Sequence, residues 1–518
     1  MPLLTWSSFP VLVLAGLALW EALPCLHPSW RNARWWYGTA WFARPWGVWA
    51  SLNIVYRYLA AWGVGDRTSY PFYFEPWRSG IRWNAMLAWL ASCRGLAMWS
   101  LILLLLALLF LFTCRRIVAA PPSRRMTTLM LVVLVAFAFV LPLVYECLPE
   151  GPADMRDSSG SFLRAWLDSG STMLYCMPRV TTKSHYLKHF QEIQPTLGAS
   201  IHGVTHPPGA SLALYWMGKL FGATGHIATD RVRYALGSTL FAAMGVAAVF
   251  FLGWTLYGSR QIGLISAALW TVKPAALAYN TFAPDAVYTV FFILCLALSW
   301  RVATADRPLW GSMAGLGIAL YALAMVNFIW PLVAALFGLM VLIFAHRLRL
   351  RPTDWLVRGV VPLGLTVALL ITTCVQYRLD YMAIFHYAMT CYADYHKPGV
   401  YVRAMEIIGG QVDLYLLTGS FCAYIFWTRF PGWVRRKPLP PQALFFLVIL
   451  AFQLLPILFL NGPAGEASRI WAWIPAVPVV VTASYLCAMD RPRFLVPMAA
   501  GFALFQYYGM RLFLMALG

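Results

Sequence analysis

Charged residues are scarce in this sequence. Only 11% of its 518 residues are Asp, Glu, Lys or Arg, whereas soluble domains carry roughly 25%. Hydrophobic residues make up 61%, and runs such as SLILLLLALLFLFTC at 100–114 are too apolar for a surface in water. Each helix that crosses a membrane needs about 20 apolar residues. The composition therefore excludes a soluble protein and predicts an all-α protein that crosses a membrane many times.

Acidic residues are scarcer than basic ones. The chain has 19 Asp and Glu against 39 Lys and Arg, which gives a net charge of +20. In a soluble protein this excess would suggest nucleic acid. In a membrane protein, basic residues mark cytoplasmic loops and contact anionic headgroups. We therefore expect membrane lipids, and no nucleic acid, as partners.

Cysteine pairs and a leader cleavage site are also lacking. None of the ten cysteines forms a CxxC pair, so we interpret them as small core residues and not as a zinc or disulfide framework. No A-x-A-like site follows the apolar stretch 8–26, which favours a retained anchor over a cleaved signal peptide.

Apolar segments predict about 13 transmembrane helices. Residues 44–64 are ambiguous, since this Trp- and Arg-bearing segment can span the membrane or lie in its interface. The predicted spans are 8–26, 86–113, 127–147, 231–256, 261–281, 286–303, 309–326, 328–346, 357–376, 408–428, 441–461, 469–488 and 493–515.

Four strongly basic connectors fix the orientation of these spans. The positive-inside rule places all of them in the cytoplasm. They are CRRIVAAPPSRR (114–125), HRLRLRPTDWLVR (346–358), TRFPGWVRRK (428–437) and MDRPR (489–493).

A parity count then defines a large first extracytoplasmic loop. The span 127–147 starts inside, so residue 148 lies outside. An odd number of spans must separate it from the connector at 346, and five are predicted. A further span at 207–222 would break this parity. We therefore predict that HPPGASLALYWMGKLFG (206–222) is a surface helix that begins at its prolines. The outer loop is then 148–230, and 377–406 and 461–469 are outer loops too.

Acidic residues at this outer side are candidates for a general base. Asp154 and Asp157 come within ten residues of the predicted helix exit, although on pattern alone helix N-capping by Asp157 is the favoured explanation. Asp285 lies between two spans and can also be a cap. Glu466 precedes Arg469 by three residues, and the two can pair with each other.

Basic and imidazole side chains gather in the same outer loop. The positive-inside rule does not place them there, so binding of a phosphate or pyrophosphate is one explanation. Contact with lipid headgroups is the other. The loop residues are Arg179, Lys183, His185, Lys188, His189, His202 and His206, and Arg469 is a further candidate.

Two HxxxH spacings in this loop raise the question of a metal. His185 and His189 can share a helix face, but Gly203 and the prolines make 202–206 a poor helix. We predict no metal or other cofactor. Lys273 is an ionisable residue within the span 261–281, and we expect it to snorkel or pair near the outer end.

Four strings carry a resemblance to a known family: SGSFLRAWLDSG after an Asp at a helix exit, THPPGASLALYW, RYALGSTLFAAMGVAAVFFLGWTLYG, and ALWTVKPAALAYNTFAPDAVYTVFF. The chain resembles the C-fold glycosyltransferases that use polyprenyl-phosphate sugars, such as protein O-mannosyltransferases and lipid A aminoarabinose transferases. The resemblance covers roughly 127–346, and GEASRIWAWIPAVP is similar to a Glu-x-x-Arg element of some bacterial relatives.

The resemblance implies a domain organisation. Residues 1–120 would be an added N-terminal membrane segment, 121–346 the catalytic transmembrane module with the outer loop 148–230, and 347–518 a C-terminal transmembrane module.

The resemblance also implies roles for individual residues. Asp157 or Asp154 resembles the catalytic Asp, and Asp285 a second acidic residue. Basic loop residues would hold the lipid phosphate. The family's usual Asp-Glu pair is absent, because Ser158 follows Asp157, and His206 stands where the family has Lys before the prolines.

The expected function is transfer of a sugar, with inversion, from a polyprenyl monophosphate to a lipid, glycan or protein acceptor on the extracytoplasmic face. A glycosyl phosphate has a good leaving group, so one base and a set of cations suffice, whereas glycosidases need two carboxylates. The alternatives are a glycan ligase that uses a pyrophosphate lipid and a flippase or transporter for an anionic lipid. In a bacterium the protein would lie in the inner or plasma membrane.

Overall fold

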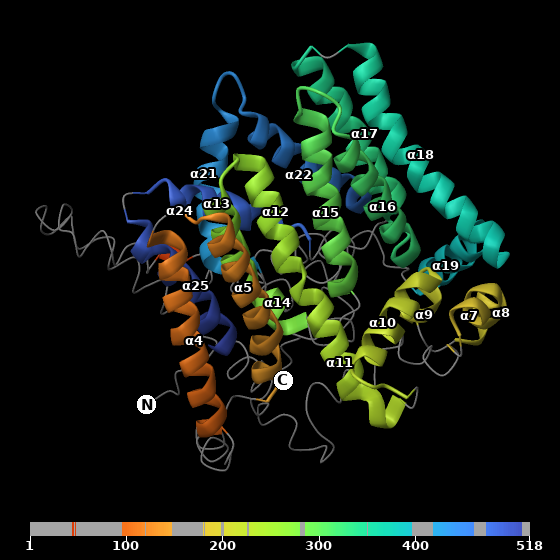
Figure 1. Ribbon diagram of the computed structural model, residues 1–518, viewed down its shortest axis with the longest axis horizontal. Helices are drawn as coiled ribbons and strands as arrows, with labels where there is room; N and C mark the ends of the chain where they lie inside the picture. Colours follow the sequence, from red (N-terminus) through yellow and green to blue (C-terminus); the bar gives the residue numbers. More distant parts are fainter. Residues whose placement is uncertain are drawn as a thin grey trace, which may run out of the picture.

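The structure is a computed structural model, and all regular elements in the part of the chain that it describes are helices (Figure 1). The described residues are 44–45, 47, 96–119, 121–147, 180, 182–197, 201–224, 227–279, 285–349, 351–395, 418–459, 473–489 and 491–509. The predicted segments 8–26 and most of 44–64 lie outside them.

The helices form a bundle and a layer of shorter helices across one end of it (Figure 1). The bundle contains α4 (Leu96–Ala119), α5 (Arg124–Glu146), α11 (Ile227–Ala243), α12 (Gly245–Tyr257), α13 (Arg260–Thr271), α14 (Pro274–Tyr279), α15 (Asp285–Thr304), α16 (Trp310–Val326), α17 (Trp330–Arg347), α18 (Pro352–Tyr377), α21 (Ser420–Val434), α22 (Pro441–Phe459), α24 (Ala476–Cys487) and α25 (Pro492–Gly509). The layer contains α7 (Lys183–Lys188), α8 (Phe190–Thr196), α9 (Ile201–Thr205), α10 (Pro208–Leu220) and α19 (Tyr381–Tyr395).

The bundle is that of an integral membrane protein. Four helices of the described part are long and apolar enough to cross a membrane: 97–119, 124–145, 232–257 and 352–377. Five shorter apolar helices accompany them. Large apolar side chains such as Leu104 and Leu108 of α4 are exposed, as expected for a surface that faces lipid. The total of about 13 spans stays a prediction.

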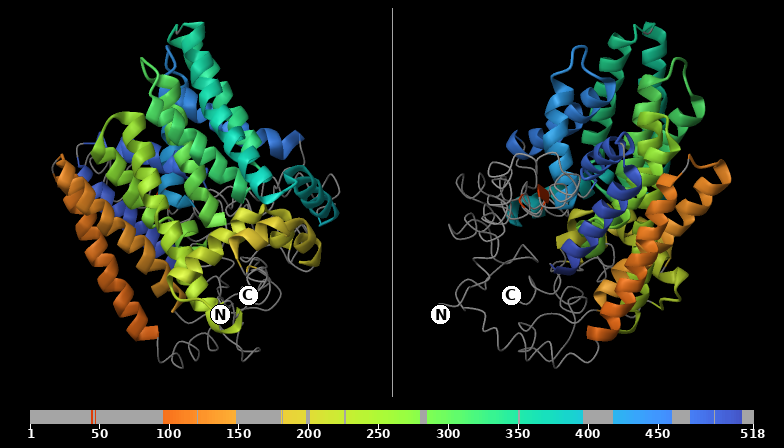
Figure 2. Two further views of the ribbon diagram at one scale, coloured as in Figure 1. Left: turned by 45° about the vertical axis from the view of Figure 1, so that its right-hand side comes forward. Right: turned by 90° about the vertical axis from the view of Figure 1, so that its left-hand side faces the viewer.

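The basic connectors meet at one end of the bundle. Arg493 donates from Nη2 to the carbonyl oxygen of Ala119 at 2.6 Å, which joins the connectors before α5 and α25. Arg347 donates to the carbonyl oxygen of Leu439, which joins the connectors before α18 and α22. The α7–α10 layer lies at the opposite end (Figures 1 and 2). We call these the basic end and the layered end.

The segment 206–222 contains a short surface helix, as the parity count predicts. α10 has Pro207 at its N-cap and Pro208 in its first turn, where the missing N–H of proline costs no helical hydrogen bond. Its 13 residues extend only about 20 Å. Gly209 lies against the backbone of Met325 at the end of α16, and Trp216 is exposed on the other face.

The layer has an apolar core of its own. Tyr186, Phe190, Leu212, Phe328 and Ile384 are buried together, from five segments of the chain. The buried amide of Gln194 donates to the carbonyl oxygens of Val204 at 2.7 Å and Ile384 at 3.3 Å. These bonds tie α8 to α9 and α19.

Two sequence expectations for this end were wrong. The segment 377–406 was predicted as a loop, but Tyr381–Tyr395 is a helix, because Ile384 and Ala388 bury one face against the layer. Residues 202–206 were predicted as a poor helix, yet α9 forms one turn before Pro207, helped by its packing on α19.

The predicted span 261–281 is interrupted. α13 ends at Thr271, and α14 begins at Pro274. Proline has no N–H to continue the helical ladder and disfavours the α conformation at the residue before it, which here is Lys273. The prediction of one continuous helix was therefore wrong at this position.

Candidate active site

His206 lies at the junction between α9 and α10. Its half-buried ring packs against Tyr288 of α15, with 6.0 Å between ring centroids and 24° between ring planes. The Thr205 hydroxyl is 3.3 Å from Nδ1 of His206. Tyr288 is one helical turn beyond Asp285, the first residue of α15. The fold therefore brings His206 to the helix end that carries Asp285.

An aromatic chain continues from this contact into the bundle. Tyr288 packs edge-on against Phe292 at 6.3 Å, and Phe292 stacks on Trp473 at 4.9 Å with planes 3° apart. Trp473 is buried and follows Arg469 by four residues. His206 and Trp473 thus both reach α15, the helix that begins with Asp285.

Lys183 and His185 lie elsewhere on the layered end. Both are exposed on α7, and the Lys183 ammonium is 5.7 Å from the ring centroid of Tyr377, the last residue of α18. Lys183 is therefore beside α18, whereas His206 is beside α15. The sequence grouped these side chains only because they share one loop.

The predicted histidine pair does share a helix face. The rings of His185 and His189 are 4.6 Å apart, and Nδ1 of His189 is 3.1 Å from a carboxylate oxygen of Glu192. Among the described residues, no three His, Cys, Asp or Glu side chains gather into a metal site.

Several predicted site residues lie outside the described part of the chain. They are Asp154, Asp157, Arg179, Glu466 and Arg469. For His202 and Asp285 the structure describes the helical backbone and not the side chain. Their roles stay predictions.

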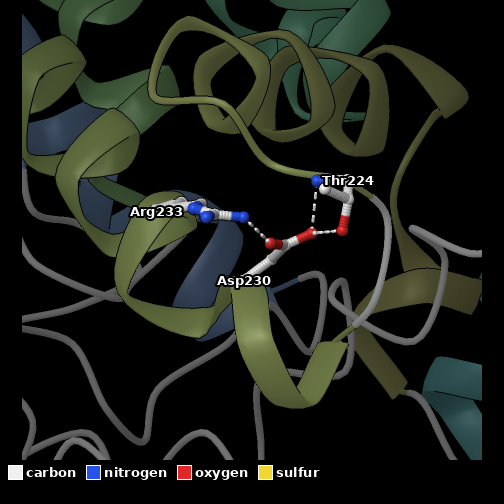
Figure 3. A network of polar contacts seen from close by, with 3 residues as sticks. All are labelled: Thr224, Asp230 and Arg233. Atoms are coloured by element: carbon white, nitrogen blue, oxygen red, sulfur yellow. Dashed lines mark hydrogen bonds and ion pairs between the residues drawn. The ribbon is translucent and has the colours of Figure 1, made fainter.

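Sequence reasoning missed Asp230, a buried carboxylate at the start of α11. Figure 3 shows that it accepts hydrogen bonds from the backbone N–H and the hydroxyl of Thr224 and pairs with Arg233 at 2.6 Å. Its side chain is 0% exposed. This carboxylate closes the turn between α10 and α11, so its hydrogen bonds serve the fold. The available signal was Arg233, three residues after Asp230, at the start of the predicted span 231–256.

Lys273 is buried instead of snorkelling. The side chain is 3% exposed, and its ammonium lies 3.3 Å from the ring centroid of Trp270. A desolvated cation–π contact contributes about 2 kcal/mol, whereas burial of an ion costs several kcal/mol. The ring alone therefore does not offset the burial. The predicted snorkelling was wrong, because the break after α13 turns this residue into the bundle.

No protein-family model and no curated protein matches the sequence. Two crystal structures of ArnT from Cupriavidus metallidurans are similar to this structure. The apo state has a TM-score of 0.47 and 16% identity and covers 75% of this chain and 77% of ArnT. The state bound to undecaprenyl phosphate has a TM-score of 0.43 and 14% identity and covers 74% and 76%.

Proposed function

We propose that this chain is an integral membrane glycosyltransferase that transfers one sugar from a polyprenyl monophosphate to an acceptor on the extracytoplasmic face. The contact between His206 and Tyr288 carries the proposal, because it places an imidazole at the helix end that begins with Asp285. This place is at the layered end, opposite the arginines that the positive-inside rule assigns to the cytoplasm.

The reaction needs one base and several cations. The acceptor oxygen attacks the anomeric carbon, the bond from that carbon to the phosphate oxygen breaks, and the phosphate leaves with the electron pair. The anomeric configuration inverts. A carboxylate takes the acceptor proton; Asp157 is the first choice and Asp154 the second. Cationic side chains stabilise the departing phosphate.

Other residues hold the substrates in this scheme. Arg179, Lys183, His206 and Arg469 are proposed contacts of the phosphate, with His185 and His202 as further members of the basic set. Asp285 and Glu466 orient the acceptor or these cations. Lys183 would reach the phosphate from the α18 side and His206 from the α15 side.

Sugar transfer by the purified protein tests the proposal. A panel of radiolabelled polyprenyl-phosphate sugars serves as donors, and a membrane extract as the acceptor. Asp157→Asn is expected to lower the rate of transfer by about 100-fold or more, which is the usual rate contribution of a general base, and to leave donor binding unchanged. Asp154→Asn is tested beside it, and Asp306→Asn, an exposed carboxylate at the basic end, is the matched control. Full activity in both aspartate variants removes these residues from catalysis.

We expect no requirement for a metal, because a phosphate leaving group can be stabilised by side-chain cations alone. Transfer should be unchanged after dialysis against EDTA and after later addition of Mg²⁺ or Mn²⁺. Loss of activity with EDTA and its return with a divalent cation would favour the glycan ligase that uses a pyrophosphate lipid.

One observation favours the transporter alternative. Transporters place ionisable residues at broken helices within the bilayer, and Lys273 lies at such a break. Proteoliposomes that contain a fluorescent polyprenyl phosphate distinguish the two functions. Movement of this lipid between leaflets without any sugar transfer would replace the transferase with a flippase.

A further inference from the structure

The break between α13 and α14 lies at a buried polar place in the bundle. A Cβ built on Gly419 would lie 3.5 Å from Cδ of Pro274, so the break contacts the segment before α21. The residues beside this contact are polar and buried: Lys273 on one side, Thr418 and Ser420 on the other. Four helices border this place: α13 and α14 at the break, α21 after Gly419, and α25, which packs against α14.

The two polar groups of Ser420, its backbone N–H and its hydroxyl, differ in their hydrogen bonding. The backbone N–H of Ser420 donates to Oε1 of Gln506 in α25 at 2.9 Å, and both residues are buried. The hydroxyl of Ser420 is fully buried and has no hydrogen-bond partner among the described residues. A buried hydroxyl without a partner costs free energy, so a ligand or water that bonded it would stabilise this place.

The depth of the break is consistent with an anion from a membrane lipid. α13 has 12 residues and rises about 18 Å from the basic end. In a hydrocarbon core of about 30 Å, Lys273 lies in the half nearer the layered end. Non-helical backbone at this depth occurs where it is buried in protein or lines a cavity, and intramembrane lysines commonly mark a ligand path.

We propose that Lys273, together with Ser420, forms an anion-binding site in the bundle interior that takes the phosphate group of a lipid. Trp270 holds the ammonium in position through its ring, and the ammonium and the Ser420 hydroxyl donate to the phosphate oxygens. That this lipid is the sugar donor rests on the proposed function; the binding of the anion does not.

Binding of a polyprenyl monophosphate to the purified full-length protein tests the site. The matching neutral polyprenol and inorganic phosphate are measured in parallel, and thermal unfolding reports folding. Lys273→Met removes the charge, Lys273→Arg keeps it, and Ser420→Ala removes the hydroxyl. Lys219→Met is the matched control, because Lys219 also lies over an aromatic ring, that of Tyr215 at 5.4 Å, but on the surface helix α10.

Lys273→Met is expected to weaken binding of the monophosphate at least about tenfold, as loss of a charge-assisted bond should, and to leave polyprenol binding unchanged. Lys273→Arg and Lys219→Met should bind as the wild type does. If inorganic phosphate competes in the wild type and not in Lys273→Met, free phosphate is also a ligand of the site. If it does not compete, the ligand is the lipid alone.

Wild-type affinity in Lys273→Met would overturn the inference, as would equal loss of both lipids. If Lys273→Met fails to fold, Ser420→Ala decides: weaker binding of the monophosphate alone supports the site, and unchanged binding refutes it. A wild-type protein that binds the monophosphate through Lys273 but transfers no sugar contradicts the proposed function and leaves this inference standing.

Discussion

At the scale of single residues, His206 combines two properties that substitution can separate. Its ring stacks on Tyr288, and its nitrogens can bind a phosphate. His206→Phe keeps the ring contact and removes the nitrogens. We expect this variant to unfold at the wild-type temperature and to transfer sugar at least about tenfold more slowly, because a charge-assisted bond to phosphate is lost.

His206→Leu, which removes the ring as well, is the companion variant. It should lose both thermal stability and transfer. Wild-type transfer rates in His206→Phe would show that the imidazole only packs, and the phosphate contacts would then have to be sought among the other basic residues.

Gly209 fixes how closely α10 approaches α16. A Cβ at this position would meet the carbonyl group of Met325, so Gly209→Ala must push α10 outward. We expect a loss of roughly 1–3 kcal/mol of stability, as for other overpacked sites, measured by thermal unfolding in detergent. Gly338→Ala in α17 is the control, since its Cβ would meet no atom within 4 Å. Equal stability of both variants would contradict the close packing of α10.

Residue-scale predictions succeeded where the local sequence carries the cause. The two prolines before α10 mark its start, so the position of His206 was predictable. The burial of Lys273 was not, because the break beside it packs against a segment far away in the sequence, where Gly419 lies next to Pro274. Nor could the contact of His206 with Tyr288 be inferred from either local sequence.

At the scale of elements, Gln194 joins the helices of the layer. Its amide donates to two carbonyl groups, one before α10 and one in α19. Gln194→Leu leaves both carbonyls without this donor, which costs about 1–3 kcal/mol for each buried group that stays unsatisfied. We expect faster hydrogen exchange in α8, α9 and α19 and unchanged exchange in α15–α17.

Gln191→Leu is the matched control, because Gln191 is exposed on α8. It should leave the exchange of the layer at the wild-type rate. Uniformly faster exchange over the bundle and the layer in Gln194→Leu would show that the two unfold as one unit.

Elements of strong apolar character were predictable, and interruptions were not. Apolar runs located α5, α15, α16 and α17 to within a few residues. The break after α13 lies inside a similarly apolar run, where Lys273 and Pro274 are the only charged residue and the only proline of 261–281. α19 was missed because its apolar face becomes evident only against the layer that it covers.

At the scale of the whole molecule, the positive-inside rule assigns the basic end to the cytoplasm. Thr353 in the first turn of α18 and Thr196 at the end of α8 are both exposed, at the basic and layered ends. We expect a membrane-impermeant thiol reagent on intact cells to label Thr196→Cys, and Thr353→Cys to react only after the cells are opened.

The wild-type protein gives the background from native thiols, such as exposed Cys147. Labelling of Thr353→Cys in intact cells, with protection of Thr196→Cys, would reverse the orientation and move the candidate site to the cytoplasm.

Charge counting separated the two ends of the molecule because the charges are a property of the sequence itself. Which helices neighbour each other is a different matter. α4 packs against α25, and the hydroxyl of Tyr145 in α5 bonds the carbonyl oxygen of Leu504 in α25. Such pairings depend on the shapes of many side chains at once, and no periodicity in one segment reports them.

The turn between α16 and α17 has a consequence for the surrounding lipid. α16 has 17 residues and α17 has 18, so each extends only about 26–27 Å, short of the roughly 30 Å of hydrocarbon. Phe328 in their turn packs against Tyr381 and Phe385 of α19. The helix α19 therefore occupies the space that lipid headgroups would otherwise fill at this end of α16 and α17. Acyl chains along this edge must shorten or splay to match it, and thin bilayers should therefore solvate this side of the molecule with the least distortion.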